Sequence, residues 1–198
     1  MFESIADAIS GSAWSYAIIF GVAAVDVIFP VVPSEATVIA AGVLAAQGDL
    51  QIALVILAAA AGAVVGDNAM YWVGRIFGER LVDRLFSGNR RRHYDRAHTL
   101  IESRGGYIIL IGRFIPLGRT ATTFSAGSLG WEWARFIRWD ILAGTVWASY
   151  AAGLGYFGGK TFEDHPLKAF LLAFGLALAV TGTVEIVRWF RKRAAAQS

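Results

Sequence analysis

Cysteine is absent from the 198 residues, which excludes disulfide bonds and thiolate metal sites. Lysine and arginine are absent from the first 74 residues. A cleavable signal peptide begins with a basic region, so we do not expect one here. Proline is scarce, at 4 residues, and no Ser- or Pro-rich linker divides the chain, which indicates a single domain over 1–198. No P-loop or Ser-His-Asp pattern is present, so we expect neither an enzyme nor a resident cofactor or metal.

Apolar side chains are in excess and make up 56% of the chain. They gather in runs that carry little charge, at 14–25, 52–65, 141–157 and 167–184. Such runs are too long for buried strands and too poor in charge for surface helices. The composition therefore predicts an all-α integral membrane protein.

The basic residues predict how the chain is oriented. They gather at 75–104 and at 188–193, beside apolar segments. This position favours cytoplasmic topology signals over nucleic-acid binding, the rival interpretation, because Lys and Arg mark cytoplasmic loops. The elements that we expect are transmembrane helices at 50–77, 133–157 and 167–190, an Arg-rich cytoplasmic segment at 78–104 and a cytoplasmic tail at 191–198.

Two further segments are predicted to form re-entrant hairpins, one with its leading helix at 14–47 and one at 106–130. Pro30 and Pro33 interrupt the first, and Pro116 interrupts the second. Proline removes a helical hydrogen-bond donor and clashes with the preceding turn. The halves are then too short to cross a hydrocarbon core of roughly 30 Å. One such hairpin also keeps the tail cytoplasmic, as the charge pattern requires.

The two halves of the chain resemble each other. Each hairpin is followed by an expected helix that carries Tyr-x-x-Gly, at 71–74 and at 150–153. The charge pattern gives these helices opposite orientations, so the chain is predicted to be an inverted repeat, the plan of many secondary transporters. Irregular backbone at membrane depth needs cover from protein or a water-filled cavity. We therefore expect the two hairpin tips to meet near the midplane.

Five ionisable side chains lie in apolar sequence, namely Asp26, Glu35, Asp67, Arg113 and Arg119. A central Asp or Arg costs about 2.5–3.5 kcal/mol, so these groups must be paired, hydrated or protonated. We expect the acids of the first hairpin to face the arginines of the second. Two guanidinium groups beside a helix break suit phosphate, so Arg113 and Arg119 are predicted to bind it. Asp26 and Glu35 are predicted to balance that charge or to exchange protons.

Each of these residues also has a simpler explanation. Arg113 would serve as an interfacial anchor, Glu35 as a helix cap and Asp26 as a structural partner of arginine. Asp67 is placed near the inner end of its span, where it would satisfy hairpin backbone or contact substrate. The residues expected to support the site are Asp67, Tyr71, Pro30, Pro33, Pro116, Gly118 and Thr120.

Three motifs carry a family resemblance: Phe29-Pro30-x-x-Pro33-Ser34-Glu35, Gly66-Asp67-x-x-x-Tyr71-x-x-Gly74-Arg75 and Gly112-Arg113-Phe114-Ile115-Pro116-x-Gly118-Arg119-Thr120. Together they resemble the signatures of the DedA family, within the VTT or SNARE-associated superfamily, over about 14–190. The resemblance implies a bacterial inner-membrane protein with two opposed hairpins, and it assigns importance to the acids Asp26 and Glu35 and to both arginines. It also implies a role in returning undecaprenyl phosphate to the cytoplasmic leaflet, while eukaryotic relatives scramble phospholipids.

The leading hypothesis is a flippase for a lipid-linked phosphate, most simply a polyprenyl phosphate, with coupling to protons. The expected partners are membrane lipids, the polyprenyl phosphate and protons or cations, without nucleic acid; an oligomer is compatible with the sequence. A proton-driven antiporter for a small ion or drug, a phospholipid scramblase and a membrane scaffold that acts through its Arg-rich loop are the alternatives.

Overall fold

The computed structural model describes residues 2–28, 34–85, 91–115, 118–161 and 175, with side chains described for 13–28, 34–78, 99–115, 118–161 and 175. Across these ranges the chain is helical and contains no strand. The six helices are α1 (Phe2–Val25), α2 (Ser34–Gln47), α3 (Ile52–Leu85), α4 (Arg91–Gly112), α5 (Gly118–Ser128) and α6 (Trp133–Thr161). The expected roles of Pro30, Pro33 and Pro116, the helix at 167–190 and the tail at 191–198 lie outside the described residues.

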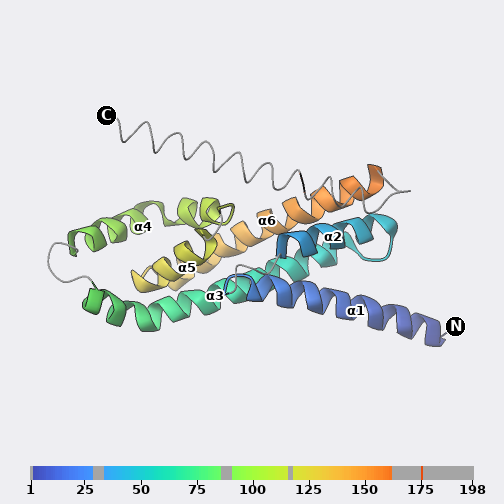
Figure 1. Cartoon of the computed structure of the whole chain (residues 1–198), viewed down its shortest axis with the longest axis horizontal. Coiled ribbons are helices and arrows are strands. Elements are labelled where there is room, and N and C mark those ends of the chain that lie inside the picture. Colours follow the sequence, from blue (N-terminus) through green and yellow to red (C-terminus); the bar gives the residue numbers. More distant parts are fainter. Residues whose placement is uncertain (1, 29–33, 86–90, 116–117, 162–174, 176–198) are drawn as a thin grey trace.

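Helix breaks fall inside both segments that were predicted to form hairpins. α1 ends at Val25 and α2 begins at Ser34, while α4 ends at Gly112 and α5 begins at Gly118. α1 runs towards the middle of the molecule and α2 runs back from it (Figure 1). α4 and α5 do the same from the opposite end, so the two breaks lie near the centre.

The helices that flank the Arg-rich segment are longer than predicted. α3 continues to Leu85, and α4 begins at Arg91 and runs unbroken to Gly112. The segment 78–104 is therefore largely helical, and no boundary separates it from the second expected hairpin at 106–130.

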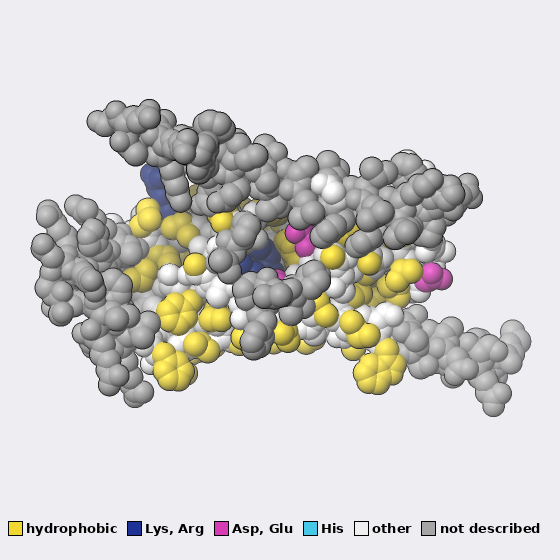
Figure 2. All heavy atoms as spheres, in the orientation of Figure 1, with side chains coloured by type: hydrophobic (Ala, Val, Ile, Leu, Met, Phe, Trp, Pro, Cys, Tyr) yellow, Lys and Arg dark blue, Asp and Glu magenta, His cyan; other side chains and the backbone are white. Residues whose placement is uncertain are grey.

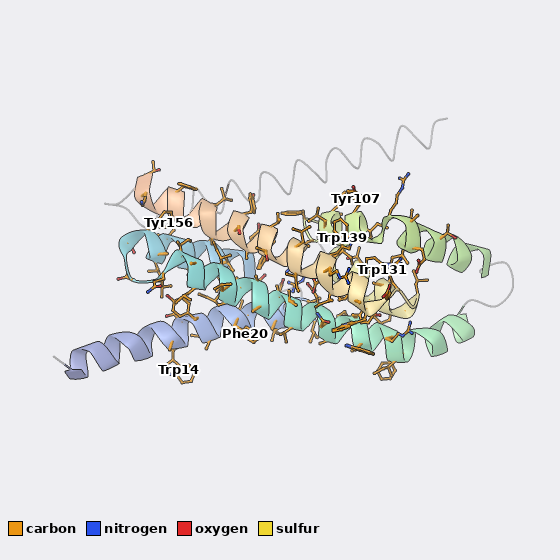
Figure 3. The ribbon with its side chains drawn as sticks, turned by 180° about the vertical axis from the view of Figure 1, so that it is seen from behind. Trp14, Phe20, Tyr107, Trp131, Trp139 and Tyr156 are labelled. Carbon is orange, nitrogen blue, oxygen red and sulfur yellow. The ribbon has the colours of Figure 1, made fainter. Side chains whose placement is uncertain are left out.

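A pair of glycines at that expected boundary explains the continuity. A Cβ built on Gly105 would collide with the ring of Trp131, and one on Gly106 would collide with the ring of Trp139. The two glycines thus make room for indole rings instead of breaking the helix. Figure 3 shows both tryptophans at the same end of the molecule as Tyr107, whose ring centroid lies 5.7 Å from that of Trp139.

Each short helix packs on the long helix from the other half of the chain. α2 lies along α6, and α5 lies along α3 (Figure 1). A Cβ on Gly42 of α2 would collide with the Ala152 carbonyl oxygen of α6. In the same way, a Cβ on Gly127 of α5 would collide with the Tyr71 carbonyl oxygen of α3. Small residues that let two backbones approach are typical of helix packing in membranes.

The long helices supply matching glycines. A Cβ on Gly155 of α6 would collide with the Ile39 carbonyl oxygen of α2, and one on Gly74 of α3 would collide with the Phe124 carbonyl oxygen of α5. α3 and α6 also pack on each other and run in opposite directions (Figure 1). The two long helices therefore form the centre of the structure, with one short helix docked on each.

The core consists of two apolar clusters. One is built around Ile39, Val55 and Ala148, and the other around Tyr71 and Phe136. Large apolar side chains also cover the outside of the molecule, and Figure 2 shows them over much of the visible face. Such a surface suits lipid better than water, because soluble monomers seldom expose large apolar patches.

Within the described residues, one helical segment is long and apolar enough to cross a membrane, Ile52–Gly78 of α3. Two shorter apolar helical segments, Ala13–Val25 and Ser34–Gln47, lie on either side of the first break.

We predict that Gly155→Ala destabilises the protein and that Gly153→Ala on the same helix does not. The methyl group at position 155 would push α2 away from α6, and overpacking of this kind costs about 1–3 kcal/mol. Nothing lies within 4 Å of a Cβ at Gly153, where alanine gains about 0.5–1 kcal/mol of helix stability. Thermal unfolding in detergent measures both variants. Equal melting temperatures would contradict the close α2–α6 contact.

Candidate functional site

Asp67 is the centre of a buried network of ion pairs. Its Oδ2 accepts a hydrogen bond from Arg113 Nη1 at 2.7 Å, and its Oδ1 accepts one from Arg119 Nε at 2.7 Å. Asp67 lies near the middle of α3, which runs from Ile52 to Leu85. Two guanidinium groups compensate its charge, which makes an acid in an apolar helix tolerable.

Arg119, in the first turn of α5, uses all three of its nitrogens. Besides the Nε bond to Asp67, Nη1 lies 3.1 Å from Asp26 Oδ2. Nη2 donates to the backbone carbonyl oxygens of Ala63 at 3.0 Å and Ala23 at 3.3 Å. Arg119 therefore ties α1 and α3 to the start of α5, and each of its three nitrogens has a partner in this conformation.

Arg113 differs from Arg119 in keeping two nitrogens without a partner. It follows the end of α4, its side chain is 3% exposed, and its guanidinium carbon lies 5.1 Å from the centre of the Trp147 ring. Nη1 binds Asp67, but Nε and Nη2 have no hydrogen-bond partner among the described residues. An interfacial anchor would place its charged end in water, so this burial speaks against the anchor alternative.

The two helix breaks are joined by polar contacts. Asp26, just past the end of α1, accepts hydrogen bonds from Arg119 and from Ser34 Oγ at 2.9 Å. The Thr120 hydroxyl of α5 donates to the Val27 carbonyl oxygen at 2.8 Å. The expected pairing of a first-hairpin acid with a second-hairpin arginine is thus present for Asp26.

Glu35 does not take part in that pairing. It lies half-buried in the first turn of α2 and forms no ion pair with Arg113 or Arg119 in the described structure. Its carboxyl group instead lies within electrostatic reach of Asp26 and of the Tyr150 hydroxyl on α6. The expectation that both acids face the arginines is therefore wrong for Glu35 in this conformation.

Asp140 of α6 is a member of the network that the sequence analysis missed. It is 1% exposed, and its Oδ1 lies 3.6 Å from Arg113 Nη1. It directly follows a basic and an aromatic residue, Arg138 and Trp139, a combination typical of a membrane interface. The available signal was helical spacing, because Asp140 is in register with the buried residues Phe136, Ala143 and Trp147.

The other supporting residues shape the site's surroundings. Tyr71 donates a hydrogen bond from its hydroxyl to the Trp131 carbonyl oxygen at 2.5 Å and stacks on Phe136, so it anchors the start of α6. Gly118 permits the tight turn before α5, because a Cβ there would meet the Gly112 carbonyl oxygen at 2.5 Å. In the described part of the chain no three acidic or histidine side chains form a metal-site cluster.

The fold and the site together define a helical membrane protein with charged side chains held between two helix breaks. Figure 2 shows acidic and basic side chains near the middle of the visible face. Residues 32–157 match the VTT domain. The protein DedA of Escherichia coli K12 is 32% identical over 193 residues, which cover 93% of this chain and 87% of that protein. The chain therefore belongs to the DedA family.

Other relatives carry less informative names. An uncharacterized membrane protein of Synechocystis is 34% identical over 175 residues, or 86% of this chain and 79% of its own. An uncharacterized membrane protein of Mycobacterium tuberculosis is 29% identical over 170 residues, or 84% and 75%. No solved structure matches the chain. These names support a location in a bacterial membrane.

We predict that Asp67→Asn lowers the free energy of unfolding by about 3–5 kcal/mol, because it leaves two buried guanidinium groups without their shared counter-ion. Glu132→Gln is the matched control. It removes one acid of an exposed pair with Arg135, whose side chains are 58% and 56% exposed, and such pairs contribute about 0–1 kcal/mol. Thermal unfolding in detergent compares the two variants. A larger loss for Glu132→Gln would contradict the central role of Asp67.

Proposed function

We propose that this protein moves a lipid-linked phosphate, most simply a polyprenyl phosphate, between the two leaflets of a bacterial membrane. The observation that carries the proposal is the free edge of the buried Arg113 guanidinium. Family membership makes a transport role compatible with the chain, and the chemistry of the site supports phosphate as the group recognised.

The free edge has the right chemistry for a phosphate headgroup. Nε and Nη2 of Arg113 lie on one edge of the guanidinium plane, and two parallel N–H donors match two phosphate oxygens. Asp67 holds the opposite nitrogen, Nη1, so bidentate binding at the free edge needs no ion pair to break. Gly144 of α6 lies beside this edge, since a Cβ built on it would be 3.8 Å from Nη2.

Arg119 takes a different part in this proposal. Its nitrogens are all partnered, so it positions α1, α3 and α5 around Arg113 in the conformation described. A phosphate would reach Arg119 only after the contact with Asp26 opens. That contact spans the two helix breaks, and its opening would accompany a change between two access states.

We further propose that the chain crosses the membrane several times as an inverted repeat of two re-entrant hairpins, with its C-terminus in the cytoplasm. The glycine contacts support the repeat: position 42 corresponds to 127, and 74 corresponds to 155. This register differs from the pairing of 71–74 with 150–153 that the sequence suggested. Gly153 makes no close contact, so Gly155 is the counterpart of Gly74.

The apolar exterior suits a lipid substrate. Leu57 and Ile141 are among the large side chains exposed on the two long helices, where acyl or prenyl chains would contact them. A prenyl chain could thus stay in the bilayer while its phosphate enters the polar centre. The free edge of Arg113 would bind the phosphate group and would not distinguish one prenyl chain from another.

The test is transport of polyprenyl phosphate in liposomes that contain the purified protein. Arg113→Ala and Arg113→Lys should each lose most of the activity, because a lysine keeps the charge near Asp67 but not the two-donor edge. Arg135→Lys, at an exposed position on α6, is the matched control and should transport normally. Full activity of Arg113→Lys would overturn the phosphate role.

Arg119→Lys separates positioning from binding. A lysine cannot replace bonds to two carboxylates and two carbonyl oxygens, so this variant should unfold at a lower temperature than Arg113→Lys.

Two outcomes would favour the other functions. Flux that follows the pH gradient and ignores lipid phosphate would indicate an antiporter for a small ion or drug. Loss of function on neutralising Arg90–Arg92, with Arg113 dispensable, would indicate a scaffold; those side chains lie outside the described ones.

A further inference from the structure

Asp140 is buried without a hydrogen-bond donor to stabilise an ionised carboxylate. Its Oδ1 lies 3.6 Å from Arg113 Nη1, beyond normal hydrogen-bond length, and its Oδ2 has no partner among the described residues. An ionised carboxylate in such a place loses its hydration without replacement, which is costly. A protonated Asp140 avoids that cost and gains a donor of its own.

A partner for that donor lies on the facing helix. Asp67 Oδ2 and Asp140 Oδ1 both approach the same nitrogen, Arg113 Nη1, at 2.7 Å and 3.6 Å, so the two carboxyl groups lie next to each other. Ionised carboxylates only accept hydrogen bonds, so a bond between two carboxyl groups requires that one of them carries a proton. Asp67 already accepts hydrogen bonds from both arginines, so both of its oxygens act as acceptors. The proton therefore belongs on Asp140.

The charges of the network lead to the same assignment. Asp26, Asp67 and Asp140 face Arg113 and Arg119, so three acids meet two bases. With every group ionised, one negative charge would remain buried without compensation. One proton makes the network neutral, and Asp140 is the acid with the fewest donors around it.

We propose that Asp140 is a proton-binding residue that determines whether Arg113 is free to bind phosphate, an inference that rests on the proposed function. With its proton, Asp140 donates to Asp67 and leaves the Nε–Nη2 edge of Arg113 open. Without it, the Asp140 carboxylate becomes a second counter-ion of Arg113 and competes with the phosphate. Proton and phosphate therefore bind cooperatively, each raising the affinity for the other.

The charged groups that face Asp140 come from three elements. Asp67 approaches from α3, Arg113 from the turn after α4, and Arg119 from the start of α5. On its own helix the nearest charged residue, Arg138, is exposed. Glu35 of α2 faces Tyr150, further along α6.

The experiment measures the affinity of farnesyl phosphate for the full chain in nanodiscs as a function of pH. For the wild type, affinity should rise as the pH falls through the titration of Asp140, by up to about tenfold per pH unit, the limit for one linked proton. Asp140→Asn mimics the protonated side chain, so its affinity should stay high and lose this dependence. Ionisation of the phosphate itself is common to both proteins.

Asp49→Asn is the matched control, because it makes the same exchange at an exposed carboxyl group. It should keep the wild-type pH profile. A wild-type profile in Asp140→Asn would overturn the proposal, provided that its melting temperature matches that of the control. If Asp140→Asn unfolds, Asp140→Glu replaces it as the variant; its longer carboxyl chain should shift the pH profile, and an unshifted profile would overturn the proposal.

Infrared spectroscopy of the protein without ligand separates this inference from the proposed function. A protonated carboxyl group gives a C=O stretching band that shifts in heavy water, and Asp140→Asn should abolish it. No such band in the wild type would overturn the proton assignment, whatever the protein transports. If the wild type shows the band but binds no farnesyl phosphate at any pH, the proposed function is overturned, and the coupling of proton and phosphate with it. The assignment of the proton to Asp140 would still stand.

Discussion

The carboxylate of Asp67, shared between two guanidinium groups, is the interaction on which the polar centre depends. It binds Arg113 and Arg119 at the same level along the axis of α3. Through Arg119 it also fixes the position of Asp26 and the end of α1. A buried ion pair adds little net stability over an apolar pair, but breaking one leaves a costly charge. The network is therefore better understood as a device that specifies how the two helix breaks meet than as a source of stability.

The two arginines show how one residue type acquires two roles from its position. Arg119 opens α5 beside the backbones of α1 and α3, so carboxylates and carbonyl oxygens accept hydrogen bonds from each of its three nitrogens. Arg113 follows α4, and its guanidinium lies over the indole ring of Trp147. That contact covers the flat face of the guanidinium but gives no hydrogen-bond partner to Nε and Nη2 among the described residues. Their sequence context is alike, since both flank the same break. Only the three-dimensional surroundings separate the fixed guanidinium from the available one.

Features that depend on local composition were predictable. Both breaks lie in the segments that were predicted to contain them. Ionisable residues in apolar segments are expensive, so their burial in ion pairs such as Asp26–Arg119 could be expected. Features that depend on the rotation of a helix about its axis and on neighbouring helices were not predictable. Asp140 was missed because its aromatic and basic sequence neighbours face elsewhere. The direction of the Glu35 side chain depends on the rotation of α2 about its axis, which turns it towards Tyr150. The glycines at 105 and 106 permit contact with indole rings, which composition alone does not reveal.

The exchange of short helices between the two halves has a consequence for motion. Because α5 is docked on α3 and α2 on α6 through backbone contacts at glycine, neither short helix can move with the rest of its own half of the chain without breaking those contacts. The natural rigid units are α3 with α5 and α2 with α6, each assembled from both halves of the sequence. Any relative displacement of these two units must pass through the seam where Asp67 meets Asp140.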